Sequence, residues 1–153
     1  MWVPPEESDP VLLHAPTRKS IGMFGAVRPY DGRLVTMRAE VFQAETFLEF
    51  LMKLLPHRRR GRMMVVVVDN ARWHHAIALE PWLFENRHRI RLIFLPPYSP
   101  DLNVIERVWK LTRYLCTHNR YFQELADLVS VVCEQFERWL KGSDTLRRLC
   151  AII

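Results

Sequence analysis

Short β-prone runs alternate along the chain with longer stretches of helical spacing. The runs "KSIGMFGAV" and "RLVTMRAEV" flank "RPYDG", in which Pro29, Asp31 and Gly32 are turn formers. Residues 19–41 therefore predict a β-hairpin. In "AETFLEFLMKLL" the apolar residues recur on one helical face, which predicts a helix over residues 44–55.

Two apolar runs in the middle of the chain predict strands. "MMVVVVDNA" holds four consecutive valines, a pattern typical of a parallel strand that is covered on both faces, and "IRLIFLP" predicts a second buried strand. Between them, "HHAIALEPWLFENR" predicts a helix that Pro81 shortens or kinks. A third helix is predicted from near Asn103, and a fourth over "YFQELADLVSVVCEQFERWL".

The order hairpin, helix, strand, helix, strand, helix, helix predicts an α/β fold, with helices packed on a mixed sheet. At 153 residues the chain fits a single domain, 1–153. Residues 1–18 are expected to be irregular, although "VLLHA" could form a short strand. Residues 119–153 are expected to supply the C-terminal helices, and no internal repeat is visible.

The composition, 49% hydrophobic and 25% charged, is that of a globular protein rather than a disordered one. No apolar run approaches the length of a membrane helix, so we expect no membrane partner. The opening residues lack the pattern of a secretion signal, which leads us to expect a cytoplasmic location. The three cysteines stand far apart, so we expect reduced, mostly buried thiols rather than disulfides or a zinc ribbon.

A formal net charge of +5 favours a polyanionic partner. The densest basic cluster is "HRRRGR", which ends the segment before the valine run. Its arginines, Arg58, Arg59, Arg60 and Arg62, are candidate contacts for DNA phosphates. The alternative is a solvated connection between a helix and a strand.

Two acidic residues follow the two predicted central strands. Asp69 ends the valine run, at the strand end where open α/β sheets place their ligand sites, although an Asp-Asn pair there also caps turns and helices. Glu106 lies three positions after Asn103, a spacing that also fits a capping box. If the strands are parallel, both carboxylates lie at one rim, where they can hold Mg²⁺ for cutting or joining a nucleic-acid backbone.

The segment between these two acids is stiffened by Pro96, Pro97 and Pro100, which would fix Glu106 relative to Asp69. Tyr98 within it is expected to pack with a hydrogen-bonded hydroxyl, and direct contact with DNA is the alternative. Trp109, beyond the segment, is expected in the helix core rather than as a platform for bases.

Two adjacent histidines follow Asp69 in "DNARWHH". Neighbouring residues on a helix point about 100° apart, so His74 and His75 are not expected to share a metal ion. His74 could instead orient Asp69 or approach a DNA phosphate, and a capping or packing role is the bland alternative.

The strings "VVVVDNARWHH" and "LIFLPPYSPDLNVIERVWK" together resemble the signature motifs of Tc/mariner-type DDE transposases, in their bacterial insertion-sequence branch. The resemblance is strongest over residues 19–118. It implies a ribonuclease H-like fold in which three acids bind two Mg²⁺ or Mn²⁺ ions, for strand nicking at transposon ends and strand transfer. It matches Asp69 to the second acid and Glu106 to the third, while Asp101 and Asn103 belong to the structural turn.

The family's first aspartate commonly precedes a tryptophan that corresponds to Trp2, and no such strand is found before it here. The resemblance therefore implies a sheet without its first central strand and an incomplete two-metal site. We expect a C-terminal fragment of a split or decayed transposase, with transposon-end and target DNA, an upstream transposase product or a second copy as partners. The alternative is a catalytically inactive fragment that binds DNA or transposase.

Overall fold

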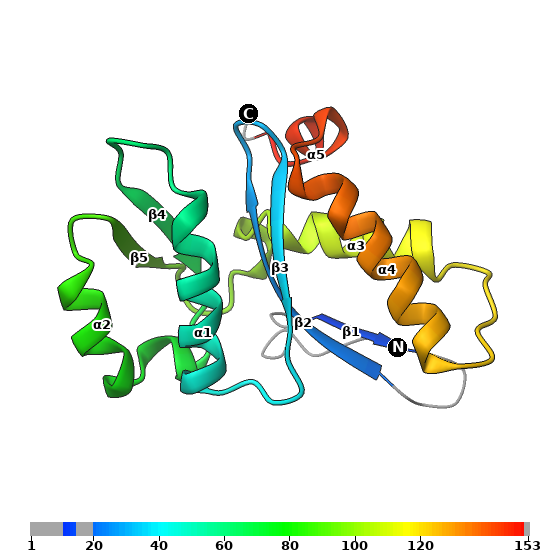
Figure 1. Cartoon of the computed structure of the whole chain (residues 1–153), viewed down its shortest axis with the longest axis horizontal. Coiled ribbons are helices and arrows are strands. Elements are labelled where there is room, and N and C mark those ends of the chain that lie inside the picture. Colours follow the sequence, from blue (N-terminus) through cyan, green and yellow to red (C-terminus); the bar gives the residue numbers. More distant parts are fainter. Residues whose placement is uncertain (1–10, 15–19, 152–153) are drawn as a thin grey trace. The chain divides into compact units, whose positions relative to one another are not determined.

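The computed structural model describes residues 11–14 and 20–151 (Figure 1). The chain divides into two compact units. The central unit is Val41–Asn103, and the flanking unit combines Pro10–Glu40 with Val104–Ile153. Predictions that fall on residues 1–10 and 15–19 lie outside the described residues.

The central unit is built around two parallel strands, β4 (Met64–Val68) and β5 (Ile90–Phe94), paired in register from Met64 opposite Ile90 to Val68 opposite Phe94. This confirms that the two predicted strands exist and are parallel. The prediction that the second strand is buried is wrong, because only Ile90 is buried while Arg91, Ile93 and Phe94 are exposed. The other elements are α1 (Ala44–Leu54), η2 (Leu55–His57), η3 (Arg72–His75), η4 (Ile77–Leu79), α2 (Glu80–Glu85) and η5 (Pro100–Leu102).

The prediction that the valine strand is covered on both faces is wrong. Val65 is 51% exposed, Val67 47% and Ile93, which pairs with Val67, 46%. Successive side chains of a strand point to opposite faces, so these three share one face of the two-stranded sheet. That face is open, whereas Val68 at the strand end is buried.

The helix predicted over "HHAIALEPWLFENR" is also broken into shorter pieces. Two 3₁₀ turns, η3 and η4, occupy its first part, and only Glu80–Glu85 forms an α-helix, α2. Pro81 lies in the first turn of α2, where the missing N–H of proline costs no helical hydrogen bond. Proline therefore marks the start of the helix rather than a kink within it.

The flanking unit holds an antiparallel three-stranded sheet in the order β1 (Val11–His14), β2 (Ser20–Arg28) and β3 (Arg33–Arg38). The predicted hairpin and the short strand in "VLLHA" are both confirmed. The turn places Gly32 at φ 69°, a conformation that glycine adopts without steric cost. The helices of this unit are α3 (Ile105–Cys116), α4 (Leu125–Leu140) and α5 (Asp144–Leu149).

The flanking unit contains a well-formed core between its sheet and helices, with α4 packed against β3 and α3. Trp109 of α3 is fully buried, and its ring lies 6.0 Å from that of Phe136 on α4. The prediction that Trp109 belongs to the core is confirmed. Other buried core residues of α3 and α4 are Ile105, Val108, Leu128, Val132 and Trp139.

All three cysteines are free, as predicted, with Cys116 and Cys150 buried and Cys133 half-buried. Burial raises the pKa of the Cys116 and Cys150 thiols. In the part of the chain that the structure describes, no helix combines the length and the apolar character needed to cross a membrane.

Candidate functional site

Asp69 follows the buried Val68 at the carboxyl end of β4, as the sequence predicts. The backbone N–H of Leu95 donates to the carbonyl of Val68 at 2.8 Å, which holds the ends of β4 and β5 together. The Asp69 side chain is 21% exposed, so solvent reaches the carboxylate at this rim. The position is the strand end at which open α/β sheets bind ligands.

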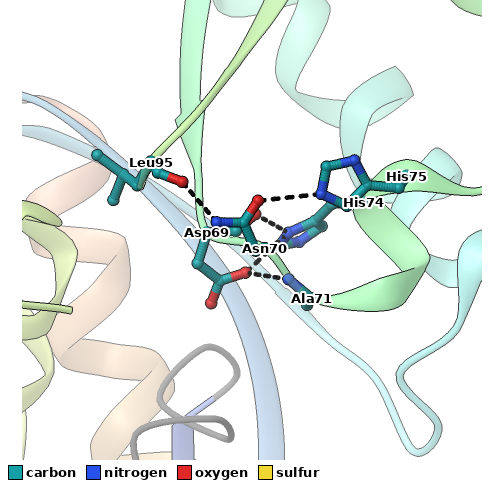
Figure 2. Close-up of polar contacts among 6 residues, drawn as sticks. All are labelled: Asp69, Asn70, Ala71, His74, His75 and Leu95. Carbon is teal, nitrogen blue, oxygen red and sulfur yellow. Dashed lines mark hydrogen bonds and ion pairs between the residues drawn. The ribbon is translucent and has the colours of Figure 1, made fainter. Parts of the chain in front are cut away.

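One oxygen of Asp69 is held by two neighbours (Figure 2). Its Oδ1 atom accepts a hydrogen bond from the backbone N–H of Ala71 at 3.0 Å and lies 2.9 Å from Nδ1 of His74. The same Nδ1 lies 3.1 Å from the backbone carbonyl oxygen of Asp69. Both oxygens only accept, so His74 carries its proton on Nδ1. Within the described residues Oδ2 forms no hydrogen bond.

His74 is buried next to Asp69. It is 3% exposed, and its ring centroid is 4.4 Å from that of Phe47 on α1 and 5.8 Å from that of Trp73. This packing favours the orienting role over an approach to DNA phosphate. The expected turn interaction of Asp69 is also present, through Ala71, and it leaves the second carboxylate oxygen available.

Asn70 links the ends of β4 and β5, and the sequence analysis did not single it out. Its side-chain amide donates to the carbonyl of Leu95 at 2.5 Å, and its side-chain oxygen lies 3.1 Å from Nε2 of His75. His75 stacks on Phe94 with the ring centroids 4.0 Å apart. Figure 2 shows Asn70 spanning from the β4 end to Leu95. The two adjacent histidines thus serve different partners, as their divergent directions predict.

The proline-rich segment after β5 exposes its tyrosine. Tyr98 is 91% exposed and has a φ of 56°, so the prediction that it packs is wrong. Positive φ is sterically costly for a residue with a side chain, and the flanking prolines restrict the neighbouring backbone. The alternative, that Tyr98 contacts DNA, stays a prediction.

The remainder of this segment forms the 3₁₀ turn η5, which Pro100 opens and in which Asp101 is exposed. Asn103 ends the turn in an extended backbone conformation and is 8% exposed. The structural roles of Pro96 and Pro97 in fixing Glu106 stay predictions.

Glu106 lies in the first turn of α3 and is half-buried, with its Oε1 atom enclosed. It belongs to the flanking unit, whereas Asp69 belongs to the central unit. The convergence of the two carboxylates at one rim therefore stays a prediction.

The basic cluster forms a loop between η2 and β4. Arg59, Arg60 and Arg62 are exposed, and Arg58 donates through its guanidinium to the Arg62 carbonyl at 2.7 Å. Gly61 takes a φ of 74°, which turns the loop back toward β4. Contact between these arginines and DNA stays a prediction.

Comparison with known proteins assigns the chain to a family. A family model described as "DDE superfamily endonuclease" matches residues 1–129, which is most of the chain. The chain is a member of the DDE superfamily endonuclease family. The Asp-Asn-Ala motif at the end of β4 and the Glu106 motif both fall inside the matched region.

Two of three similar proteins, an IS630 protein and the Tc1 transposase, support placing this DDE superfamily member with the Tc1/mariner–IS630 transposases. The chain is 31% identical over 116 residues to protein y4pE/y4sA of Sinorhizobium fredii, covering 76% of the chain and 82% of that protein. It is 28% identical over 108 residues to an IS630 insertion-element protein of Shigella sonnei, covering 71% and 31% of the two chains. It is 36% identical over 69 residues to the Tc1 transposase of Caenorhabditis elegans, covering 45% and 24%.

The DDE superfamily member shares its fold with a solved transposase. It matches the catalytic domain of Mos1 mariner transposase at a TM-score of 0.64 and 18% identity, over 93% of this chain and 76% of that one. It also matches Mos1 in a strand transfer complex, at a TM-score of 0.58 and 18% identity, over 92% and 43% of the two chains. The predicted α/β, ribonuclease H-like fold is thereby confirmed.

The donor chemistry of this family member suits a divalent metal only in part. Asp69 presents a carboxylate oxygen that forms no hydrogen bond in the described chain, and hard cations such as Mg²⁺ prefer such oxygens. However, no group of three or more His, Cys, Asp or Glu side chains that could hold an ion gathers within residues 11–14 and 20–151. Within those residues, Asp69 thus offers one suitable donor oxygen, and no set of three or more ligands gathers around it.

Proposed function

We propose that this chain is a catalytic part of a transposase, which nicks and transfers DNA strands in a reaction that depends on Mg²⁺ or Mn²⁺. The observation that carries the proposal is the Asp69 carboxylate, fixed through Oδ1 and open at Oδ2, in the motif that the family model matches. The matched relatives include the Tc1 transposase, which supports DNA transposition as the process.

Asp69 and Glu106 are the proposed metal ligands. Two divalent cations, when bound, stabilise the attacking and leaving oxygens of phosphoryl transfer. Asp69 would contribute its Oδ2 atom, because Oδ1 is already held by Ala71 and His74. Glu106 would contribute from the first turn of α3, after the rigid proline segment.

The proposed partners are transposon-end DNA and target DNA. One structural neighbour is the strand transfer complex of Mos1, a transposase of the same fold, which supports this choice. The chain spans about a third of the IS630 protein and about a quarter of the Tc1 transposase, so an upstream transposase product and a second copy of the chain are further proposed partners.

Nicking of plasmid DNA tests the proposal directly. The chain, alone and together with any adjacent transposase segment encoded upstream, is incubated with supercoiled plasmid carrying the ends of its own element, with Mg²⁺ or with EDTA. Asp69→Asn and Glu106→Gln should each lose Mg²⁺-dependent nicking. Asp127→Asn and Glu137→Gln make the same chemical changes at exposed positions of α4 and should keep it.

Two results would overturn the assignment. Nicking that persists in Asp69→Asn or Glu106→Gln would remove these residues from the chemistry. Binding of DNA without any nicking, in the chain and in its combination with the upstream segment, would replace the enzyme with a catalytically inactive binding fragment.

A further inference from the structure

The two parallel strands of the central unit begin beside a pair of basic segments (Figure 1). The loop over residues 58–63 leads into β4, and a turn over residues 86–89 leads into β5. The backbone N–H of Met64 donates to the carbonyl of Arg89 at 2.7 Å, which joins the start of β4 to that turn. The sequence analysis singled out the first segment alone, and the structure places a second one next to it.

Seven arginines gather at this end of the small sheet, four before β4 and three in or just before β5. No Asp or Glu occurs in residues 54–68 or 86–94. Six of the arginines are exposed, and together they are called the basic rim: Arg59, Arg60, Arg62, Arg87, Arg89 and Arg91. Within the described residues, the members of the rim that form no ion pair include Arg60, Arg62, Arg89 and Arg91. Like charges gathered without acidic partners favour a polyanion.

Hydrogen bonds to backbone carbonyls hold both basic segments in place. In the loop before β4, the guanidinium of Arg58 donates to the carbonyl of Arg62 at 2.7 Å. In the turn before β5, the N–H of Arg89 donates to the carbonyl of Asn86 at 2.8 Å. A backbone that is already ordered loses less conformational entropy when a ligand binds, so the rim is prepared for binding.

The basic rim lies at the opposite end of β4 from Asp69. Because β4 and β5 are parallel and in register, both strands begin at one edge of the sheet and end at the other. From Met64 to Val68 the strand rises about 13 Å. Phosphates of one DNA strand follow one another about every 3.4 Å along the axis. A nucleic acid bound at the rim is therefore held several phosphates away from a group that reacts at Asp69.

We infer that the basic rim binds a segment of duplex DNA apart from the phosphate that reacts. The choice of DNA among polyanions rests on the proposed function, whereas the position of the rim does not. Guanidinium groups suit this partner, because their planar donors pair with phosphate oxygens. Contacts to phosphates carry no sequence information directly, so the rim should bind duplexes with and without the ends of the element alike.

DNA binding in EDTA tests the rim separately from catalysis. The whole chain is titrated against a fluorescein-labelled duplex of about 20 base pairs without element ends, between about 50 and 200 mM salt, and fluorescence anisotropy reports binding. The test variant is Arg89→Gln with Arg91→Gln, which changes only the newly assigned segment. Arg87 is kept, because its guanidinium already packs over the ring of Phe84 at 4.2 Å.

Two controls separate charge from structure. Arg138→Gln with Lys141→Gln removes the same charge at the exposed end of α4 and should stay within about twofold of the wild type. Arg89→Lys with Arg91→Lys keeps both charges and should keep the salt dependence of the wild type.

The test variant should bind at least about tenfold more weakly at the lowest salt. The slope of log K against log salt should fall by about 2, because each lost phosphate contact removes about 0.9. Adding Arg60→Gln and Arg62→Gln should bring the total fall to about 4, because both segments contact one duplex.

Three outcomes would overturn the inference. A test variant that matches the α4 control would remove the second segment from DNA binding, provided that both unfold at the wild-type urea midpoint. A variant with a lower midpoint is replaced by Arg89→Met with Arg91→Met, which keeps an apolar stem and is judged by the same criterion. A four-arginine variant with the slope of the test variant would show that the two segments do not bind together. A wild-type chain that does not bind the duplex at about 50 mM salt would leave the rim to an acidic protein partner.

The two proposals fail in different ways. Asp69→Asn should bind DNA in EDTA as the wild type does and lose nicking. If Asp69→Asn keeps nicking, the proposed role of Asp69 fails while the binding result for the rim stands. If the rim variant binds normally while Asp69→Asn loses nicking, the rim assignment fails and the catalytic one stands.

Discussion

The Nδ1 atom of His74 contacts Asp69 twice, at 2.9 Å from the carboxylate Oδ1 and at 3.1 Å from the backbone carbonyl oxygen. The two contacts fix both the side chain and the backbone of Asp69 relative to one buried ring. Because Phe47 of α1 packs on that ring, the carboxylate is tied to a helix that lies far from it in the sequence. The Asp69 carboxylate is thus held in one orientation by contacts within the chain.

Substitution of His74 should lower metal affinity only when the new side chain cannot donate a hydrogen bond to Asp69 as Nδ1 does. The amide nitrogen of asparagine can occupy the place of Nδ1, so His74→Asn should keep Mn²⁺ affinity within about threefold. His74→Leu removes the donor and should weaken Mn²⁺ binding by about 10- to 100-fold, as is usual when the partner of a metal ligand is lost. Electron paramagnetic resonance, which detects free Mn²⁺, measures the Mn²⁺ affinity of both variants.

The control for His74 is His88→Leu, the same change at an exposed histidine before β5. It should bind Mn²⁺ as the wild type does. Equal affinities in His74→Leu and His88→Leu would show that Asp69 needs no help from His74.

The basic loop before β4 should contribute to DNA affinity. If Arg59, Arg60 and Arg62 contact phosphates, replacing all three with glutamine should lower the salt slope of DNA binding by about 3, one unit for each contact. Fluorescence anisotropy across salt concentrations measures the slope. An unchanged slope would instead favour the solvated-connection alternative for this loop.

Gly25 is the position at which β2 leaves room for the core tryptophan. A Cβ atom there would overlap the Cζ2 and Cη2 atoms of Trp109, which is fully buried. Gly25→Ala should therefore destabilise the flanking unit by about 1–3 kcal/mol, the usual cost of overpacking. Urea unfolding followed by tryptophan fluorescence measures the loss.

Gly61→Ala provides a comparison in which space is not limiting. An added Cβ at Gly61 meets nothing within 4 Å, although its φ of 74° strains any side chain. This variant should lose about 1–2 kcal/mol, through the left-handed backbone alone. Unlike Gly25→Ala, it should leave the fluorescence of the folded state unchanged. A folded-state spectrum altered equally in both would contradict the contact with Trp109.

The hairpin turn should make stability sensitive to acid. Arg28 donates to the Asp31 carboxylate and holds its pKa at about 2, below the ordinary 3.8. A lowered pKa in the folded state stabilises the fold above pH 3.8, and the contribution is lost as the pH falls toward 2. The difference in unfolding free energy between wild type and Asp31→Asn should therefore shrink from pH 4 to pH 2. Urea unfolding at each pH measures it, and a difference independent of pH would contradict the prediction.

Local patterns in the sequence predicted those elements whose environment is decided nearby. The β2–β3 hairpin follows from its turn residues, and α1 follows from one apolar face. Trp109 was placed correctly because its helical neighbours share its buried face. Asp69 was placed at a strand end because the apolar run stops there.

Features that depend on distant packing were not predictable in this way. The valine run has the composition of a doubly covered strand, but coverage depends on what packs on Val65 and Val67, which their own sequence does not encode. Tyr98 is an aromatic residue of the kind that usually packs in a core, but its backbone is left-handed and its side chain is exposed. The hydrogen bond from the Asn70 side chain to the Leu95 carbonyl joins two strand ends, and no local spacing in the sequence predicts it.

The open face of β4 has a consequence for handling the protein. The run Met63–Val68 is apolar, β-prone and uncharged, a composition that favours assembly into fibrillar sheets when it is accessible. Charged residues that flank such runs act as gatekeepers against assembly, and here they are Arg62 and Asp69. Neutralising Asp69 removes one gatekeeper along with the proposed ligand. Asp69→Asn should therefore also lower the solubility of the protein, because the carboxylate that is proposed to bind metal is also a gatekeeper against assembly.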